Sequence, residues 1–178
     1  MKMAAAALLL LGTACAHGGP SYEGFEDVPY GYGAARKVWS KRAQLSVHVE
    51  ELGPKDAPAV VLLHPWGMSM TVWADVAPKL AASYRVLLVD LPGHGKSDKL
   101  ASPHPMRRLA VAVVDAVAAA GVDRAVFMGN SLGGATSLAV AELAPERVAG
   151  LVLIAAPGGA VLPEPLRRAS RVLSLIHI

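Results

Sequence analysis

The chain has 178 residues, a length that allows one or at most two folded domains. Hydrophobic residues make up 53% of the chain and charged residues 17%, below the usual quarter. Seventeen Lys and Arg against fourteen Asp and Glu give a net charge of +3, which is too small and too scattered for a nucleic-acid-binding surface. We therefore expect no nucleic-acid partner.

The N-terminus has the pattern of an export signal. A basic start precedes an apolar run at residues 4–11, which is too short to span a bilayer and has the length of a signal-peptide core. Small residues then lead to Cys15, the only cysteine, as in a bacterial lipoprotein signal, although Gly12 stands where that pattern usually has Leu. We expect residues 1–15 to be this signal and Cys15 to be lipidated, giving a membrane-anchored cell-envelope lipoprotein. The alternative is ordinary cleavage after Ala16, giving a periplasmic or secreted protein.

The next stretch connects this signal to the folded part. Residues 16–37 are rich in Gly, Pro and Tyr without periodicity, so we expect a flexible tether ahead of a core at residues 38–160. Within the core, residues 44–50 alternate apolar and polar side chains. That alternation is typical of a half-buried antiparallel edge strand, with His48 on its exposed face.

Strands and helices then alternate along the chain. Apolar runs predict strands at residues 59–63, 85–89, 125–128 and 150–154, and helical spacing predicts helices at residues 70–82, 106–120 and 132–143. Continuous apolar strands are typical of a parallel sheet that is covered on both faces. The alternation implies right-handed crossovers, and ligands of such sheets bind beyond the carboxyl ends of the strands.

The most informative motif is Gly-Asn-Ser-Leu-Gly at residues 129–133, because it matches the G-x-S-x-G pattern of a nucleophile elbow. Gly129 and Gly133 let a strand and a helix pass close together, which leaves Ser131 at the sharp turn between them. The helix N-terminus behind the serine favours developing negative charge. The alternative is a glycine-rich turn in an ordinary α/β protein.

Two further motifs follow earlier strands: His-Pro-Trp-Gly at residues 64–67 and Asp-Leu-Pro-Gly-His-Gly-Lys-Ser at residues 90–97. Together with the elbow, and in this order, they resemble the α/β-hydrolase superfamily over about residues 38–170. The resemblance implies a mostly parallel, doubly wound sheet of the α/β-hydrolase type. It also implies a serine hydrolase that cleaves a small-molecule carboxylic ester or related acyl bond through an acyl-serine intermediate, with no cofactor and no metal.

The resemblance also assigns roles to individual residues. Ser131 is the expected nucleophile, and the backbone amides of Trp66 and Leu132 are the expected oxyanion hole. Pro65 stands where the family's loop usually has glycine. Proline has no N–H, but the donor is the next residue, so we expect the oxyanion hole to survive.

His64, Asp90 and His94 are interpreted as structural residues of the loops. The family's triad follows the order Ser, acid, His along the chain, so His64 comes too early to be the base and is expected to brace the oxyanion loop. No carboxylate follows the strand at residues 150–154 directly. The catalytic acid and histidine therefore cannot be assigned, and we expect both to lie beyond the end of the chain.

The C-terminal residues support the same expectation. Residues 161–172 resemble the start of a cap region. Residues 173–178 coincide with one reading frame of the transposase adapter used in sequencing libraries, and we interpret them as a non-native tail. The sheet would then be truncated before its last strands, and a chain of this length is expected to be inactive.

Several functions share these motifs and stay open. Carbon–carbon bond hydrolases, lactonases, aminopeptidases and cofactor-free haloperoxidases have the same elbow. A non-catalytic envelope binding protein that has kept the fold is a further alternative, which a complete gene without a distal Asp and His would favour. The sequence fixes neither the substrate nor the oligomeric state.

Overall fold

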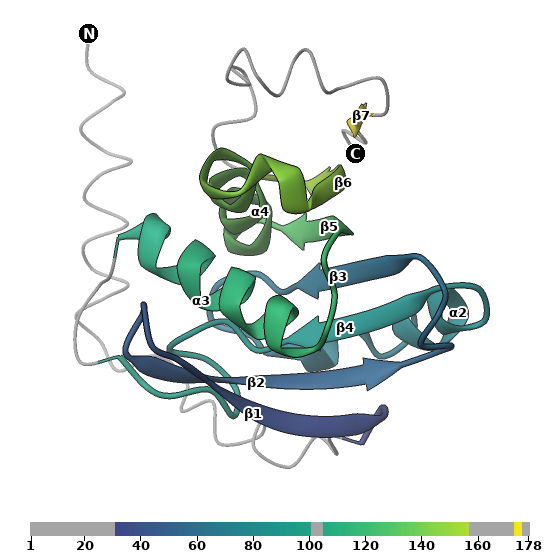
Figure 1. Cartoon of the computed structure of the whole chain (residues 1–178), viewed down its shortest axis with the longest axis horizontal. Coiled ribbons are helices and arrows are strands. Elements are labelled where there is room, and N and C mark those ends of the chain that lie inside the picture. The colour runs from purple at the N-terminus through teal and green to yellow at the C-terminus, as the bar shows by residue number, and fades with distance from the viewer. Residues whose placement is uncertain (1–30, 101–104, 157–172, 176–178) are drawn as a thin grey trace, which may run out of the picture.

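The computed structural model describes residues 31–100, 105–156 and 173–175, which form one sheet with helices on its two faces (Figure 1). The strands are β1 Ala34–Ser40, β2 Leu45–Leu52, β3 Ala59–Leu63, β4 Arg85–Val89, β5 Ala125–Asn130, β6 Val148–Ile154 and β7 Leu173–Leu175. The helices are α3 Met106–Ala119, α4 Leu132–Leu143 and the short α2 Ala77–Ala81, with single 3-10 turns η1 Met70–Trp73 and η2 Pro145–Arg147.

The sheet is mixed and mostly parallel, as the sequence predicts. Its strand order is β1-β2-β4-β3-β5-β6-β7. The pairs β1–β2 and β2–β4 are antiparallel, whereas β4, β3, β5, β6 and β7 run parallel to one another. The doubly wound α/β fold class is confirmed, and the predicted helices at residues 106–120 and 132–143 agree with α3 and α4 to within one residue.

The continuous apolar strands are explained by burial on both faces. In β3, Val61 and Leu63 point to the cluster under α3 and α4, whereas Val60 and Leu62 point to the cluster under η1 and α2. All four side chains are at most 5% exposed. Figure 1 shows α3 lying across the front of the sheet. A strand covered on both faces has no polar side, which is why its sequence reads as an unbroken apolar run.

The helix predicted at residues 70–82 is wrong in its extent. The segment forms η1, then an irregular turn, and then only five residues of α2. Pro78 lies in the first turn of α2 and has no N–H, so a continuous helix could not make the bond back to residue 74. The turn is held instead by short-range bonds from Ala74 N to Thr71 O and from Val76 N to Trp73 O.

The N-terminal edge of the sheet also differs from the prediction. The strand β1 starts at Ala34, inside the expected tether, and it pairs with residues 45–51 of β2. Because β2 also pairs with β4, it is an inner strand rather than an edge. His48 is 7% exposed rather than on the surface. The chain at residues 31 and 32 folds back, and the amides of Gly31 and Tyr32 donate to the Glu50 carboxylate beside it.

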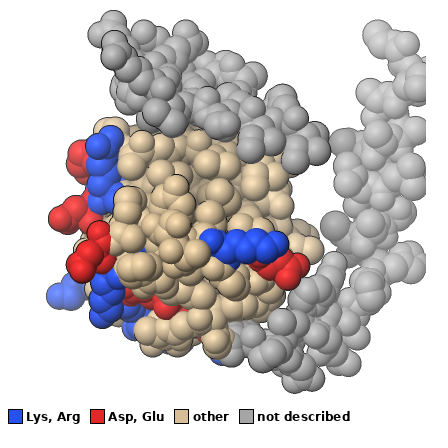
Figure 2. Space-filling view, turned by 90° about the vertical axis from the view of Figure 1, so that its right-hand side faces the viewer, with Lys and Arg blue, Asp and Glu red and all other residues tan. Residues whose placement is uncertain are grey.

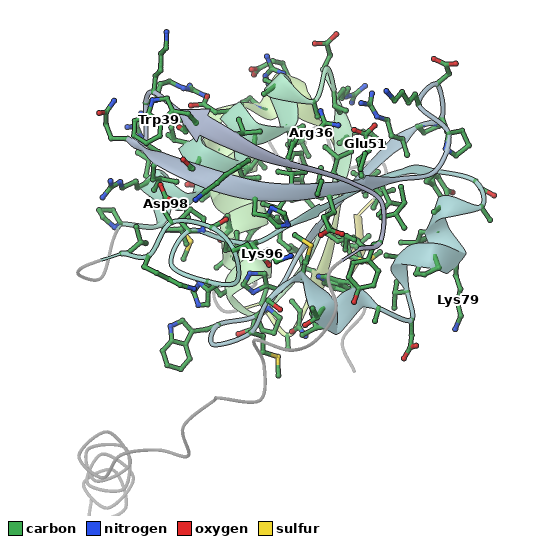
Figure 3. All side chains as sticks on the ribbon, turned by 90° about the horizontal axis from the view of Figure 1, so that it is seen from below. Arg36, Trp39, Glu51, Lys79, Lys96 and Asp98 are labelled. Atoms are coloured by element: carbon green, nitrogen blue, oxygen red, sulfur yellow. The ribbon has the colours of Figure 1, made fainter. Side chains whose placement is uncertain are left out.

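A buried carboxylate links the three strands β1, β2 and β4. Glu51 accepts from Arg85 Nε at 2.7 Å and from the Arg36 guanidinium, and Arg85 also donates to Ala120 O at the end of α3. Figure 3 shows Arg36 on β1 and Glu51 on β2 side by side. Burial raises the pKa of Glu51, but the hydrogen bond and charge of Arg85, with the charge of Arg36, outweigh it and hold this pKa below its usual range.

This network predicts a large stability effect for one conservative change. In Glu51→Gln, the amide oxygen can accept from only one guanidinium, and the NH2 group faces the other. We therefore expect the free energy of unfolding to fall by about 2–3 kcal/mol. Lys37→Ala is the matched control, because Lys37 pairs with Asp98 on the surface and an exposed pair contributes less than about 1 kcal/mol. Urea unfolding measures both variants, and equal losses would contradict the role of the buried network.

The ends of the chain lie partly outside the described residues. The expected signal at residues 1–15, with Cys15, and the expected cap start at residues 161–172 lie outside them, so export, lipidation and the cap stay predictions. Residues 173–175 pair with β6 as β7. Such pairing uses backbone groups that any sequence supplies, so the prediction that residues 173–178 are non-native also stays a prediction. None of the described helices is long and apolar enough to cross a membrane.

Candidate active site

The predicted motifs meet at one edge of the sheet. The last residues of the parallel strands are in register, with Leu63 opposite both Val89 and Gly129, and Gly129 opposite Leu153. The loops that follow β3, β4, β5 and β6 therefore leave the sheet side by side. This is the carboxyl edge of the parallel strands, where ligands of such sheets bind.

Ser131 has the backbone of a strained turn between β5 and α4. Its φ is 49° and its ψ is −108°, a combination that non-glycine residues rarely adopt, and its N–H donates to Ile154 O at 2.9 Å. It occupies the N-cap position of α4, yet its hydroxyl makes no capping hydrogen bond. Among the described residues, no hydrogen bond joins Ser131 Oγ to a histidine or a carboxylate.

The glycines of the motif are required by close backbone contacts. A Cβ atom on Gly129 would lie 2.2 Å from Gly133 O, and a Cβ atom on Gly133 would lie 2.1 Å from Leu63 O. Side chains at these two positions would collide with backbone that cannot move away. The second contact also brings the end of β3, and with it the loop that carries Trp66, against the start of α4.

The expected oxyanion donors come from these two neighbouring elements. Leu132 is the first residue of α4, where backbone N–H groups have no partner within the helix. Trp66 is three residues beyond the end of β3. The residue Trp66 is 76% exposed, so no pocket formed by the described residues encloses its side chain.

His64 is fully buried, and both its ring nitrogens are engaged. Nε2 accepts from Leu91 N at 2.9 Å, and Nδ1 donates to Pro65 O at 2.7 Å, which fixes the neutral ring with its proton on Nδ1. Burial lowers its pKa from 6.5 to about 4, although the bond to Pro65 O and the charge of Asp90 act in the opposite direction. The ring therefore ties the loop after β3 to the loop after β4.

The buried neutral His64 predicts a specific dependence of stability on pH. As the pH is lowered, His64 takes up a proton near pH 6.5 in the unfolded state but only near pH 4 in the folded state. The free energy of unfolding is therefore highest above pH 6.5 and decreases as the pH falls from 6.5 to about 4. The loss reaches up to about 3 kcal/mol. In His64→Gln, whose amide oxygen can still accept from Leu91 N, the unfolding free energy should be lower at pH 7.5 but flatter across the window. The same slope of unfolding free energy against pH in the wild type and in His64→Gln would contradict this account.

Asp90 is buried and organises the loop after β4. Its carboxylate accepts from Met70 N and from Lys96 N, both at 2.8 Å, and its carbonyl accepts from Ser97 Oγ. Gly95 has φ 49°, and a Cβ atom there would lie 2.1 Å from the Asp90 carboxylate. The carboxylate thus accepts on both oxygens, from its own loop and from η1, and among the described residues it makes no hydrogen bond to a histidine, as a catalytic acid would.

His94 lies in the same loop and contacts His64. Its Nδ1 is 3.2 Å from Pro92 O, and its ring meets the edge of the His64 ring with 5.2 Å between the centroids. Both contacts of His94 are to residues of the loops after β3 and β4. Neither histidine is hydrogen-bonded to Ser131, and the catalytic acid and base stay unassigned among the described residues.

The opposite edge of the sheet carries a shallow depression of about 390 Å³, lined by residues that include Asp56, Arg85, Asp123 and Arg124. It lies at the amino ends of β3, β4 and β5, remote from Ser131. Figure 2 shows the side of the molecule on the right of Figure 1, towards which these ends point, with basic and acidic side chains beside one another. Because Arg85 is already bound by Glu51, we assign no ligand to the depression.

Comparison with known proteins agrees with this arrangement. The sequence model of the family described as alpha/beta hydrolase fold matches residues 58–172, which is more than half of the chain. The chain belongs to the alpha/beta hydrolase fold family. Within this family, its residues 64–67, 90–97 and 129–133 are the three loops that the structure brings to one edge.

Three relatives indicate the range of chemistry in the alpha/beta hydrolase family. The dihydrolipoyllysine-residue acetyltransferase component of the acetoin cleaving system of Pseudomonas putida is 42% identical over 108 residues, covering 61% of this chain and 29% of that protein. A 2-hydroxy-6-oxononadienedioate/2-hydroxy-6-oxononatrienedioate hydrolase of Cupriavidus pinatubonensis is 38% identical over 129 residues, covering 69% of this chain and 44% of that protein. The solved esterase RhEst1 from Rhodococcus sp. ECU1013 has 33% identity and a TM-score of 0.64, and the match covers 68% of this chain and 46% of the esterase. The chain thus spans less than half of each relative.

Proposed function

We propose that the protein is a serine hydrolase that cleaves carboxylic esters or related acyl bonds, with Ser131 as its nucleophile. The observation that carries the proposal is the left-handed backbone of Ser131, enclosed by Gly129 and Gly133. Strain of this kind, about 1–3 kcal/mol, persists only where the surrounding structure enforces it, and it is concentrated at functional sites. The solved esterase among the relatives supports the choice of an acyl substrate.

In the proposed mechanism, Ser131 Oγ attacks the acyl carbonyl carbon while a general base takes the hydroxyl proton. The carbonyl oxygen becomes an oxyanion, to which the N–H groups of Leu132 and Trp66 would donate. The bond to the alcohol then breaks, the alcohol leaves with the proton, and the acyl group stays on Ser131. Attack by water on this ester releases the carboxylic acid and restores the serine.

The proposal assigns the general base and its orienting carboxylate to residues outside the described ranges. His64 does not fit the role of the base, because its Nε2 lone pair is occupied by Leu91 N and its pKa is about 4. Asp90 does not fit the role of the acid, because its oxygens are occupied by Met70 N and Lys96 N. The same contacts support their structural roles.

A carbon–carbon bond hydrolase is the second candidate. It is supported by the relative from Cupriavidus pinatubonensis, whose name gives it this class of dienoate substrate. The two reactions differ in the leaving group, which is an alkoxide in an ester and a carbanion in a dienoate. An enzyme that prefers dienoates over simple esters would select this second candidate.

The experiment is a burst assay on the protein expressed from its complete gene. With an excess of a p-nitrophenyl ester, an acyl-serine enzyme should release about one equivalent of p-nitrophenol per chain before the slower steady state. Dienoate hydrolysis is measured in parallel. Slow linear release with no burst, no saturation and no dienoate cleavage would favour the non-catalytic binding protein and refute the proposal.

A further inference from the structure

The residue that follows β6 has a backbone conformation that its sequence does not predict. Ala155 has φ 47°, and only two other non-glycine residues in the described part of the chain have positive φ, Gln44 and Ser131. Asn130 and Ile154 are opposite each other in the β5–β6 pair, so Ser131 and Ala155 follow at equivalent positions on neighbouring strands. Two left-handed residues therefore lie next to each other at the carboxyl edge.

A hydrogen bond links the two strained residues. The N–H of Ser131 donates at 2.9 Å to the carbonyl of Ile154, the group that forms the peptide bond with Ala155. The conformation at Ala155 decides where the chain goes immediately after this acceptor. A change of backbone at Ala155 therefore acts on the acceptor that holds the serine amide.

The same turn makes a second contact with the elbow. Beyond Ala155, the methyl group of Ala156 faces the start of α4, and a Cβ atom on Gly134 would lie 2.5 Å from Ala156 Cβ. Ala156 also packs against the main hydrophobic cluster. The last residue of β6 and the chain after it thus touch the elbow at two points, Ser131 N just before α4 and Gly134 in the first turn of α4.

We propose that Ala155 is a positioning residue for Ser131, which keeps the serine in its strained conformation without touching the substrate. The inference rests on the proposed function of Ser131 and extends the elbow beyond its own motif. A strained residue needs support from several sides. Gly129 and Gly133 supply it from β5, α4 and β3, and the left-handed turn at Ala155 supplies it from β6.

Four substitutions test the proposal, because they differ in how well they tolerate φ near 47°. Glycine and asparagine adopt this region readily, whereas leucine and especially β-branched valine do not. Asparagine and leucine have the same number of side-chain heavy atoms and the same branching, so Ala155→Asn and Ala155→Leu form a matched pair. The Ala155 side chain is exposed, so the larger side chains displace no described core residue.

The first readout is the rate at which a fluorophosphonate labels Ser131 in the complete protein, divided by the folded fraction from circular dichroism. Ala155→Gly and Ala155→Asn should label within about twofold of the wild type, and Ala155→Leu and Ala155→Val should label at least tenfold more slowly. Equal rates for the asparagine and leucine variants would overturn the proposal. If the leucine and valine variants do not fold, a tenfold loss in Ala155→Gly would overturn it, and a retained rate would support it.

The second readout does not depend on catalysis. Amide hydrogen exchange of Ser131 reports on its bond to Ile154 O, and protection should persist in the glycine and asparagine variants and fall at least tenfold in the leucine variant. A wild type that is never labelled but shows this exchange order would refute the proposed function and leave the positioning role standing. Labelling of Ser131 with the same amide exchange in all variants would refute the positioning role of Ala155 and leave the proposed function standing.

Discussion

Replacing Ser131 with glycine is expected to abolish turnover and, at the same time, to make the protein more stable. Loss of the attacking hydroxyl should lower kcat by at least about 10⁴-fold, as in other serine hydrolases whose nucleophile is removed. Glycine adopts φ 49° without the Cβ clash that opposes it in serine, and the serine hydroxyl makes no capping bond that would be lost. After subtraction of the greater freedom of glycine in the unfolded chain, the expected gain is about 1 kcal/mol.

Ser131→Ala is the matched control for this prediction. Alanine also lacks the hydroxyl, so it should be as inactive as the glycine variant, but its Cβ retains the strain, so its stability should stay close to that of the wild type. Ester turnover and urea unfolding separate the two effects. Activity retained in the alanine variant would contradict the catalytic role, and equal stability of the two variants would contradict the strain.

Gly133→Ala is expected to prevent folding or to cost more than about 4 kcal/mol, above the roughly 1–3 kcal/mol that is typical of overpacking, because the atoms that it meets are backbone and cannot turn away. The new methyl group would lie 2.1 Å from Leu63 O and 2.5 Å from Leu63 C, both of them backbone atoms of the central strand β3. Separating them requires α4 to move away from the sheet. That movement would also pull the elbow away from the loop that carries Trp66.

The matched control for this variant is Gly121→Ala. Gly121 follows α3 with φ 72° and open space around its Cα, so an added methyl group meets no atom within 4 Å and only the left-handed backbone opposes it. This should cost about 1 kcal/mol. Urea unfolding of both variants checks the difference, and losses within about 1 kcal/mol of each other would contradict the close approach of α4 to β3.

Much of the parallel part of the fold could be predicted because its chemistry is local. Unbroken apolar runs mark β3 and β4, since both faces of these strands are buried, and the positions of Gly129 and Gly133 follow from the space that a tight strand–turn–helix needs. These features depend on a few neighbouring residues. The sequence therefore predicted the edge of the sheet at which Ser131 lies.

The features that were missed depend on partners far along the chain. His48 was expected on the surface because its strand alternates, but the fold buries that face beneath the chain at residues 31 and 32 and beside Glu50. The strand β1 has little periodicity of its own and is stabilised by pairing with β2. The left-handed turn at Ala155 is carried by an ordinary Ala-Ala-Pro sequence, and the contacts beside it, from Ile154 O to Ser131 N and from Ala156 to Gly134, join parts of the chain that are far apart in the sequence.

The central claim is that Ser131 forms a covalent bond with the acyl group. The most direct measurement treats the protein expressed from its complete gene with a fluorophosphonate, digests it, and locates the added mass by tandem mass spectrometry. The account predicts one adduct per chain, on the oxygen of Ser131 and absent from Ser131→Ala. A folded protein that stays unmodified, or an adduct on another residue that persists in the alanine variant, would contradict it.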